Sequence, residues 1–532
     1  MSGQHTSTDS ALPRVTYSNI RADFSAVHAE LDRRIGEFER RELGALRPNC
    51  IAGRDDTRGI PYAVPSPIDA DLMLGTYVAA DGDAVDAAVT AAGAAFAGWS
   101  RLAPDLRIRT LRAVANELER RKWSLAIAAL LEVGKSRLEA LGEAEEAIDM
   151  IRYYAAEAEE GTPWQRPLHR AFANEETIDR LRPHGVFGVI APFNYPLALS
   201  VGMLTGAILT GNTAVYKPSP GMGLTARLLV DAFHAAGLPP GVVNLVCGES
   251  DTGRLLVRHP DVAGFVFTGS HRTGMEILRH CAGGRYARPV IAEMGGKNPA
   301  YVTAHADLDI AAEGVARSAF GLSGQKCSAL SRVFVHASVH DAFLGRLLAR
   351  TEELTVGDPR AAGVFTGPVV NAAAAQRFAT AVADARAAGG AIRCGGERLA
   401  GGVFDRGAYV QPTIVDGVAA DHRISREELF VPLVTVHRYD ELAAALREGN
   451  AVDYGLTAGI YTGDAAELAT FVEQAQAGVL YANRASGATT GAWPGIQSFC
   501  GWKGSGTAGK GGLGPHYLAQ FMREQSCTIM RP

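Results

Sequence analysis

The sequence predicts an α/β protein with two large domains. Its 532 residues exceed what one hydrophobic core can organise, because domains usually run to ~100–200 residues. After Arg182, short apolar segments of strand character alternate with helical segments, a pattern typical of a parallel sheet covered by helices. A second stretch of the same kind runs from about Pro289 to Asn483. Ligands of such sheets bind beyond the carboxyl ends of the strands.

Helices are expected ahead of the first sheet. Apolar residues at helical spacing among many charges predict a surface helix over 20–43, within an N-terminal arm. Alanine- and leucine-rich patterns predict three more helices, over 81–97, 105–134 and 138–160.

The first sheet is expected from the segments GVFGVIAP, NTAVYKPSP, GVVNLVCG and AGFVFTGS. The run from 185 to 216 carries no charge and is longer than a membrane helix requires. The sequence PFNYP interrupts this run, and glycines punctuate the remainder. We therefore interpret it as a buried strand, a turn, a buried helix and a second strand rather than a membrane span.

The second sheet is expected from the segments RPVIAEM, RVFVHA, YVQPTIV and GIYT. Residues 501–514 are dense in glycine, and the tail HYLAQFMREQSCTIM alternates apolar and polar residues. This alternation predicts that the tail pairs as an edge strand.

Composition excludes several classes of function. With 47% hydrophobic residues, 20% charged residues and a net charge of -5, the chain resembles an ordinary soluble globular protein, and no basic run favours nucleic acid as a partner. The seven cysteines are scattered and form no CxxC pair, which argues against a disulfide framework and against a metal site. The N-terminus shows no secretory pattern, so we expect a cytoplasmic protein.

Three residues are candidates for covalent catalysis. Cys327, in GLSGQKCSALSR, can act as a nucleophile only as a thiolate, and we expect Lys326 and a turn into a helix to favour that form. Glu293, in IAEMGGKNP, ends an apolar strand, which would raise its pKa and suit it to general-base catalysis. Asn194, in APFNYP, offers an amide donor for an oxyanion. A buried cysteine, a helix-capping glutamate and a turn asparagine are the alternatives.

The first expected strand is not followed by the dinucleotide fingerprint GxGxxG. The segment 267–274, which contains FTGS and HRTG, places small residues and N–H groups between a strand and a helix. It is a candidate for binding a pyrophosphate, or it is simply a turn.

Nine motifs occur in one order along the chain: APFNYP, GNTAVYKPSP, FTGS, EMGGKNP, GQKCS, YVQPTIV, EELFVPLV, YGLTAGIYT and FCGWKGSGT. In these motifs the chain resembles the aldehyde dehydrogenase superfamily from about Ile60 to the C-terminus. It departs from the usual FGP and FGG at FVP and FCG. The resemblance implies an α/β aldehyde dehydrogenase fold with a Rossmann-like cofactor-binding domain, an α/β catalytic domain and a small β oligomerisation flap.

The resemblance also implies how the chain is divided. We expect an N-terminal arm over 1–50, an NAD(P)-binding domain over 51–163 and 184–292, a catalytic domain over 293–497, and oligomerisation segments over 164–183 and 498–532. A homodimer or a higher homo-oligomer is expected, because both segments lie where an exposed sheet edge needs covering.

By the same resemblance, Cys327 attacks an aldehyde and forms a thiohemiacetal, whose oxyanion is held by the Asn194 amide and the Cys327 N–H. Loss of hydride then leaves a thioester, which water activated by Glu293 hydrolyses to the acid.

The resemblance places the cofactor NAD, with NADP possible, on a set of residues beyond the strand ends. Lys217 would bind the adenosine ribose, Ser270 the pyrophosphate and Glu428 the nicotinamide ribose, with Phe430 near the nicotinamide ring. The other expected cofactor contacts are Pro192, Phe193, Ser219, Gly248 and Gly269. Pro220 stands where many NAD-preferring members have glutamate, so we expect NAD with measurable use of NADP.

Within the superfamily the chain looks most like the 1-pyrroline-5-carboxylate dehydrogenase branch. The charged N-terminal arm, the helix EEAIDMIRYYA and the late GKGGLGPHYL carry this likeness. It implies L-glutamate 5-semialdehyde, an intermediate of proline catabolism, as substrate. Glu145 would face the ammonium group, Tyr195 and Phe521 would flank the chain, and the α-carboxylate would meet Ser328, Gly512, Leu513 and Gly514.

Three alternatives remain. A succinic or other semialdehyde could be the substrate, or the thioester could be released to coenzyme A, which the presence of Glu293 argues against. The third is a non-catalytic homologue that acts as a binding protein.

Overall fold

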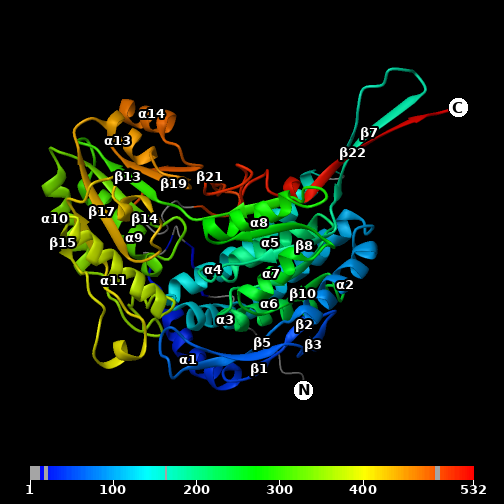
Figure 1. The fold of residues 1–532 in the computed structure, drawn as a ribbon, viewed down its shortest axis with the longest axis horizontal. Helices are drawn as coiled ribbons and strands as arrows, with labels where there is room; N and C mark the ends of the chain where they lie inside the picture. The colour runs from blue at the N-terminus through cyan, green and yellow to red at the C-terminus, as the bar shows by residue number, and fades with distance from the viewer. Residues whose placement is uncertain (1–11, 17–18, 20–21, 162–163, 486–491) are drawn as a thin grey trace.

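The computed structural model describes residues 12–16, 19, 22–161, 164–485 and 492–532. The helices expected near the N-terminus are confirmed as α1 (Ser25–Glu42), α2 (Gly82–Trp99), α3 (Pro104–Val133) and α4 (Arg137–Gly161). A proline at its first position starts α3, and Gly134 ends it in a left-handed conformation with φ of 80°. The long helices α3 and α4 pack against each other (Figure 1).

Seven strands form the first sheet, in the order β12-β11-β8-β9-β10-β2-β3. Its parallel part consists of β8 (Val186–Ile190), β9 (Thr213–Lys217), β10 (Val243–Leu245), β11 (Val262–Thr268) and β12 (Val290–Glu293). The antiparallel strands β2 (Asn49–Ile51) and β3 (Arg54–Asp56) extend one side, so the expected boundary at residue 50 falls within β2. The connecting helices are α5 (Ala198–Leu209), α6 (Gly223–Ala235), α7 (Ser250–Arg258) and α8 (His271–Ala282).

The strand order places a switch point between β8 and β11. The chain runs from β8 through β9 to β10 on one side, and then crosses to β11 and β12 on the other side. A ligand crevice is expected outside the carboxyl ends of the two central strands. The charge-free run of the sequence forms β8, α5 and β9, as predicted. Within the described part of the chain, no helix combines the length and apolar character needed to cross a membrane.

The second sheet also has seven strands, in the order β15-β16-β17-β14-β13-β19-β20. All neighbours are parallel except the edge pair β15 and β16. Its strands are β13 (Asn298–Val302), β14 (Leu330–His336), β15 (Ala391–Cys394), β16 (Thr413–Asp416), β17 (Leu433–Tyr439), β19 (Thr457–Tyr461) and β20 (Val479–Ala482). The longer helices of this part are α9 (Leu308–Phe320), α10 (His340–Glu352), α11 (Ala372–Ala387), α13 (Leu442–Asn450) and α14 (Ala465–Gln474). The α/β class predicted from the sequence is confirmed.

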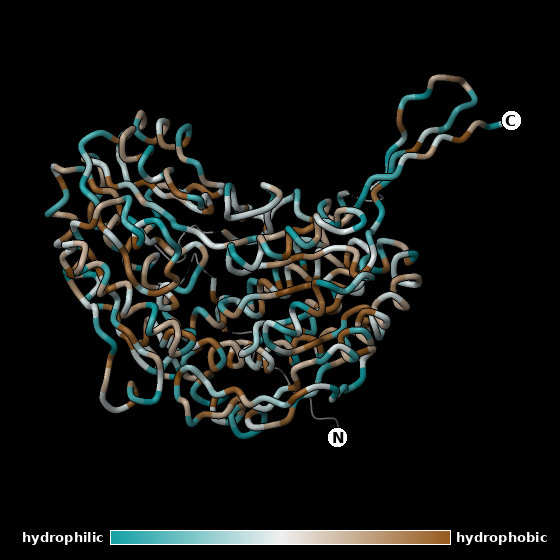
Figure 2. The backbone as a smooth tube through the Cα atoms, viewed as in Figure 1, coloured by the Kyte–Doolittle hydropathy of each residue, from teal (hydrophilic) through white to brown (hydrophobic). Residues whose placement is uncertain are grey.

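A narrow antiparallel sheet projects from the body of the molecule (Figure 1). It consists of β22 (Met522–Met530), β7 (Glu175–Pro183) and β6 (Gln165–Pro167), in that order. The C-terminal tail is therefore an edge strand, as its alternating pattern predicts. Figure 2 shows that polar residues are frequent along this projection, whereas apolar residues concentrate within the body.

Smaller sheets complete the fold. One has the order β1-β5-β4 and is formed by β1 (Leu46–Arg47), β4 (Ile60–Pro65) and β5 (Met73–Ala79). The other pairs β18 (Tyr454–Gly455) with β21 (Trp502–Lys503) and ties the segment after residue 497 to the second sheet. Short helical pieces are α12 (Arg423–Arg426) and 3₁₀ turns at Gly321–Gly324, Gly402–Arg406 and Leu518–Phe521.

Candidate active site

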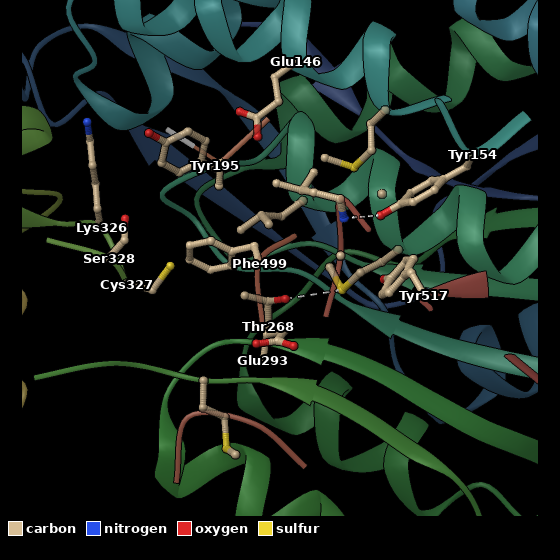
Figure 3. Close-up of a pocket in the computed structure, with 18 residues that line it drawn as sticks. Glu146, Tyr154, Tyr195, Thr268, Glu293, Lys326, Cys327, Ser328, Phe499 and Tyr517 are labelled. Carbon is tan, nitrogen blue, oxygen red and sulfur yellow. Dashed lines mark hydrogen bonds between the residues drawn. The ribbon is translucent and has the colours of Figure 1, made fainter. Parts of the chain in front are cut away.

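A cavity lies where α4 and α5, the ends of β11 and β12, and the segment 492–517 converge on Cys327 (Figure 3). Its lining residues are Glu146, Met150, Tyr154, Tyr195, Leu199, Gly202, Met203, Thr268, Glu293, Met294, Lys326, Cys327, Ser328, Ala492, Phe499, Gly512, Leu513 and Tyr517. Cys327 and Glu293, which come from different segments of the chain, thus line the same cavity. This cavity is the candidate active site.

Cys327 lies in the turn that joins α9 to β14. The turn is tight, with Leu322 and Ser323 in left-handed conformations, and it leads into a strand rather than the helix expected from the sequence. Burial, together with the carboxyl groups of Glu428 and Glu293, raises the pKa of the Cys327 thiol to about 12. The thiol therefore holds its proton at neutral pH.

The expectation that Lys326 lowers the pKa of its neighbour Cys327 is wrong. The ammonium nitrogen of Lys326 lies 2.7 Å from a carboxylate oxygen of Glu139 in α4. Figure 3 shows the Lys326 and Cys327 side chains pointing in different directions. Although burial alone would lower it, the carboxylate of Glu139 raises the pKa of Lys326. The lysine charge is neutralised by this buried pair.

Glu293 ends β12 and faces the cavity. The N–H of Gly501 donates a hydrogen bond of 3.1 Å to one of its carboxyl oxygens. Burial raises the pKa of Glu293 well above its usual range, against the weaker opposite effect of that N–H. A carboxyl group with a raised pKa is a stronger base once it is deprotonated, which suits it to activating water.

Asn194 lies in the turn after β8 and is buried, with 3% of its surface exposed. Its side-chain Nδ2 donates a hydrogen bond of 2.9 Å to the carbonyl of Gln325, two residues before Cys327. This bond fixes the amide beside the turn that carries Cys327. An amide has a second N–H, which is the group that oxyanion binding requires.

The predicted cofactor residues of the first domain gather at the carboxyl ends of its parallel strands. Pro192 and Phe193 follow β8, Lys217 ends β9 and Ser219 follows it, Gly248 follows β10, and Gly269 and Ser270 follow β11. This is the switch-point crevice, where a dinucleotide is expected to bind.

Two groups in that crevice suit a dinucleotide. Burial lowers the pKa of Lys217 to about 8, and its ammonium group donates to the carbonyl of Pro218 at 3.1 Å. Ser270 caps α8, with its hydroxyl accepting from the N–H of Thr273 at 3.3 Å, at the helix end that favours phosphate. A cation and a helix N-terminus at these strand ends are the kinds of group that can bind a dinucleotide.

Glu428 and Phe430 reach the same region from the second domain. The carboxyl of Glu428 accepts from the N–H of Gly296 at 3.0 Å, and burial raises its pKa to about 7. An added Cβ at Gly295 would collide with this carboxyl, so the glycine permits the close approach of the two segments. The Phe430 ring meets the Phe193 ring edge to face, with centroids 5.8 Å apart. The residues expected to hold the nicotinamide end thus come together with those after β8.

Four of the predicted substrate residues, Tyr195, Ser328, Gly512 and Leu513, line the cavity. Glu145 does not. Its carboxylate is bound by Arg14 at 2.8 Å and by Lys122 at 3.1 Å, on the side of α4 away from the cavity. The adjacent Glu146 lines the cavity instead, because successive helix residues point about 100° apart.

Phe521 and Gly514 also lie outside the cavity lining. Phe521 is fully buried against Phe187, with ring centroids 5.3 Å apart, and it supports Tyr517 from behind. The phenylalanine that faces the cavity is Phe499. Gly514 lies against Ser498, where an added Cβ would collide with the serine side chain.

The N–H of Leu513 was expected to bind a substrate carboxylate, but in the structure it binds another residue of the protein. That N–H donates to the hydroxyl oxygen of Tyr154 at 2.9 Å. The carbonyl of Leu513 accepts from the N–H of Gly495 at 3.0 Å. Both polar groups of this residue are therefore bound within the protein.

Several lining residues were not predicted from the sequence: Glu146, Met150, Tyr154, Leu199, Gly202, Met203, Thr268, Met294, Ala492, Phe499 and Tyr517. Three of them, Glu146, Met150 and Tyr154, are spaced four apart on α4, so one face of that helix borders the cavity. The i, i+4, i+8 spacing is the signal that could have identified this face once one member was known.

Comparison with known proteins identifies the family of the chain. The chain matches the model of the aldehyde dehydrogenase family over residues 55–527. It is 36% identical to 1-pyrroline-5-carboxylate dehydrogenase of Bacillus cytotoxicus over 497 residues, which cover 92% of this chain and 94% of the relative. The same enzyme of Bacillus mycoides is also 36% identical, over 495 residues, covering 91% of this chain and 93% of the relative.

Two solved structures extend the likeness to the fold. A point mutant of Thermus thermophilus 1-pyrroline-5-carboxylate dehydrogenase superposes with a TM-score of 0.91 at 32% identity, covering 96% of this chain and 98% of the other. A Thermus 1-pyrroline-5-carboxylate dehydrogenase with bound NAD has a TM-score of 0.89 at 34% identity, covering 95% and 96%. The predicted fold is confirmed. The chain belongs to the aldehyde dehydrogenase family and is an NAD(P)-dependent aldehyde dehydrogenase.

Proposed function

We propose that the protein oxidises L-glutamate 5-semialdehyde, the open form of 1-pyrroline-5-carboxylate, to glutamate. The relatives named above support this assignment over nearly their whole length. The observation that carries it is the position of Glu146, whose carboxylate lines the same cavity as the thiol of Cys327. A substrate with an aldehyde at one end and an ammonium group at the other matches that pair.

The binding mode follows from the lining residues. Glu146 faces the ammonium group, since a carboxylate in a cavity favours a cation. Ser328 and the backbone of Gly512 bind the α-carboxylate, and Tyr195 flanks the carbon chain. Glu146 takes the place of Glu145 in the assignment from the sequence, because Glu145 is held by Arg14 and Lys122.

Catalysis rests on three residues. The thiol of Cys327 first loses its proton to solvent, and the thiolate sulfur then forms a bond to the aldehyde carbon. The resulting oxyanion accepts hydrogen bonds from Asn194 Nδ2 and from the Cys327 N–H. The residues beyond β8, β9 and β11 would hold NAD(P), which would supply the acceptor for the hydride of the aldehyde carbon. Glu293 then takes a proton from water, the hydroxide adds to the thioester, and the carbon–sulfur bond breaks to release the acid and the thiolate.

NAD is the preferred cofactor, with measurable use of NADP. The position that could carry a ribose-binding carboxylate is Pro220, which has no such group and whose carbonyl accepts from the hydroxyl of Tyr62 at 3.0 Å. Without a carboxylate there, the protein neither binds the ribose hydroxyls of NAD through that position nor repels the 2′-phosphate of NADP, so its preference between the two cofactors is weak. The ratio of kcat/KM values with the two cofactors tests this, and a preference for NAD above about a thousandfold, some 4 kcal/mol, contradicts it.

Oligomerisation through the projecting sheet is part of the proposal, with residues 164–183 and 498–532 as the bridging segments. The strand β22 is at the edge of that sheet, and an exposed edge strand can pair with a second chain. Light scattering of the full chain and of a variant that ends before Met522 tests this proposal. If the full chain and the shortened variant form particles with the same number of chains, β22 has no role in assembly.

A kinetic panel tests the substrate assignment. The initial rates of NADH formation are compared for 1-pyrroline-5-carboxylate, succinic semialdehyde and propanal. The proposal expects the highest kcat/KM for 1-pyrroline-5-carboxylate. A preference for succinic semialdehyde, which has a carboxylate and no amine, would exclude the role given to Glu146.

A further inference from the structure

We propose that Glu143 is a positioning residue of the oxyanion site, which acts by holding the turn that carries Asn194. Its carboxylate, on α4, fixes the start of α5, the helix that follows this turn. The inference rests on the role that the proposed function gives to Asn194, and it does not depend on which aldehyde is the substrate. Glu143 itself lies outside the cavity lining and takes no part in bond making.

The start of α5 has no cap of its own. Its N-cap residue is Leu197, whose side chain cannot accept a hydrogen bond. The N–H groups of Leu197 and Ala198 instead donate to one carboxylate oxygen of Glu143, at 2.7 Å and 3.1 Å. A helix N-terminus favours a carboxylate, because its first N–H groups have no partners within the helix. Glu143 therefore supplies from α4 the cap that the sequence of α5 lacks.

The second carboxylate oxygen of Glu143 is bound by Lys135, which lies in the short connection between α3 and α4. The two atoms are 2.6 Å apart, and both side chains are fully buried. The ammonium nitrogen of Lys135 also lies 3.5 Å from the centroid of the Tyr195 ring, within the range of a cation–π contact. Lys135 thus links Glu143 to the residue that follows Asn194.

The amide of Asn194 is therefore held from two segments. Its Nδ2 donates to the carbonyl of Gln325 in the turn that carries Cys327, and the chain after it is anchored to α4 through Glu143. The second N–H of the amide can meet an oxyanion on Cys327 only if the two turns keep their separation. A displacement of about 1 Å at such a site can lower the rate by about 10²-fold.

Glu143 shares a face of α4 with residues that reach the active site. Glu139, Glu143 and Glu146 are spaced four and three residues apart, so they lie on one side of the helix. Glu139 binds Lys326, the neighbour of Cys327, at 2.7 Å, and Glu146 lines the cavity. The helices α4 and α5 pack against each other (Figure 1). One helix face thus contacts both the turn of the nucleophile and the start of α5, which suits it to setting the distance between the two turns.

Glu132 provides a matched comparison. It is buried on α3, and its carboxylate accepts from the N–H groups of Leu224 and Thr225 at 2.7 Å and 3.0 Å. These groups start α6, whose N-cap residue Met222 also makes no side-chain cap. Because α6 follows β9 rather than β8, the loss of this cap disturbs a different strand end. The two glutamates thus have similar structural roles, but Glu143 alone holds the turn of Asn194.

Two variants that differ only in the cap test the inference on the full chain. The capped variant, Lys135→Met with Glu143→Gln, keeps an oxygen that can accept from α5. The uncapped variant, Lys135→Met with Glu143→Leu, has no acceptor. Both lack the ion pair, so neither leaves a charge buried without its partner. At saturating NAD, kcat/KM for propanal per mole of folded enzyme should be about 10–10²-fold lower in the uncapped variant. Equal values in the two variants overturn the proposal.

A double-mutant cycle with Asn194 separates positioning from a general loss of structure. Asn194→Ala removes the oxyanion donor and should by itself lower kcat/KM by about 10²–10³-fold. When Asn194→Ala is added to both variants, the difference between capped and uncapped should shrink to below about threefold, because the donor that the cap positions is absent. A difference that stays the same overturns the proposal, since Glu143 would then act independently of Asn194.

The same substitutions at Glu132 are the control. The ratio of kcat/KM between Glu132→Gln and Glu132→Leu should be the same with and without Asn194→Ala, because this cap holds the segment after β9. If the Glu132 ratio shrinks as the Glu143 ratio does, the coupling reflects a weakened domain and the proposal is wrong.

The failures of the two proposals are distinguishable. If Asn194→Ala alone leaves kcat/KM unchanged, the oxyanion role in the proposed function is wrong, and this inference falls with it. If Asn194→Ala lowers kcat/KM as expected and the effect of the cap persists, only this inference is wrong. A preference for 1-pyrroline-5-carboxylate in the kinetic panel is independent of either outcome.

Discussion

The ammonium group of Lys326 and the carboxylate of Glu139 form a buried ion pair, with nitrogen and oxygen 2.7 Å apart. The pair joins the turn that carries Cys327 to α4, the helix that carries Glu146. Removing one member leaves the other charge buried without its partner, which is strongly destabilising.

Replacing Glu139 with Gln should therefore lower the free energy of unfolding by about 3–5 kcal/mol. Urea denaturation measures the change. The double variant Glu139→Gln, Lys326→Met removes both charges and should recover most of the loss. If the single and double variants are equally destabilised, the pair contributes nothing beyond the packing of its two side chains.

Glu145 and Glu146 provide a matched pair for substrate recognition. Glu146→Gln should raise KM for 1-pyrroline-5-carboxylate about tenfold or more, because a charge-assisted contact to the ammonium group is lost. Its KM for propanal should stay within about twofold, since propanal has no ammonium group to bind. Steady-state kinetics of both substrates measures the difference.

Glu145→Gln is the control for that experiment. Its carboxylate is paired with Arg14 and Lys122 away from the cavity. We expect it to alter stability and to leave the ratio of the two KM values unchanged. A ratio that moves with Glu145 and not with Glu146 would return the ammonium role to Glu145.

The pH dependence of kcat/KM should reflect two groups that act in their deprotonated forms. Burial raises the pKa of Cys327 to about 12 and that of Glu293 well above its usual range, so the active forms become more populated as pH rises. We expect kcat/KM to increase from pH 6 to pH 10, by up to about tenfold per unit where one proton must be lost. Overlapping buffers at constant ionic strength check it, and a flat profile would mean that the thiol is already ionised in the free enzyme.

The sequence was sufficient for the fold class, and it also placed Cys327 and Glu293 among the candidate catalytic residues. Periodicity located α1 to α4 within a few residues of their ends, and the alternation after Arg182 located the first parallel sheet. Cys327 and Glu293 could be singled out because their residue types and neighbours favour nucleophile and base chemistry.

The phase of α4 could not be predicted, for a physical reason. Every residue from Glu139 to Ile148 is buried, so the helix lacks the polar face that normally shows which side points inward. Nothing local therefore separates Glu145 from Glu146. The pairing of Lys326 with Glu139 could not be predicted either, and neither could the presence of Phe499 rather than Phe521 in the cavity lining. Both depend on contacts between segments far apart in the chain, which a periodic pattern does not encode.

The covalent step gives the most direct test of the account. Glu293→Gln keeps the nucleophile and removes the base, so one equivalent of NADH should form in a burst and turnover should then slow by about 10²–10⁴-fold. Intact mass spectrometry of the protein after the burst should show the acyl group, and digestion should place it on Cys327. A burst of NADH with no adduct on Cys327, or an undiminished steady rate, would contradict the assignment of these two residues.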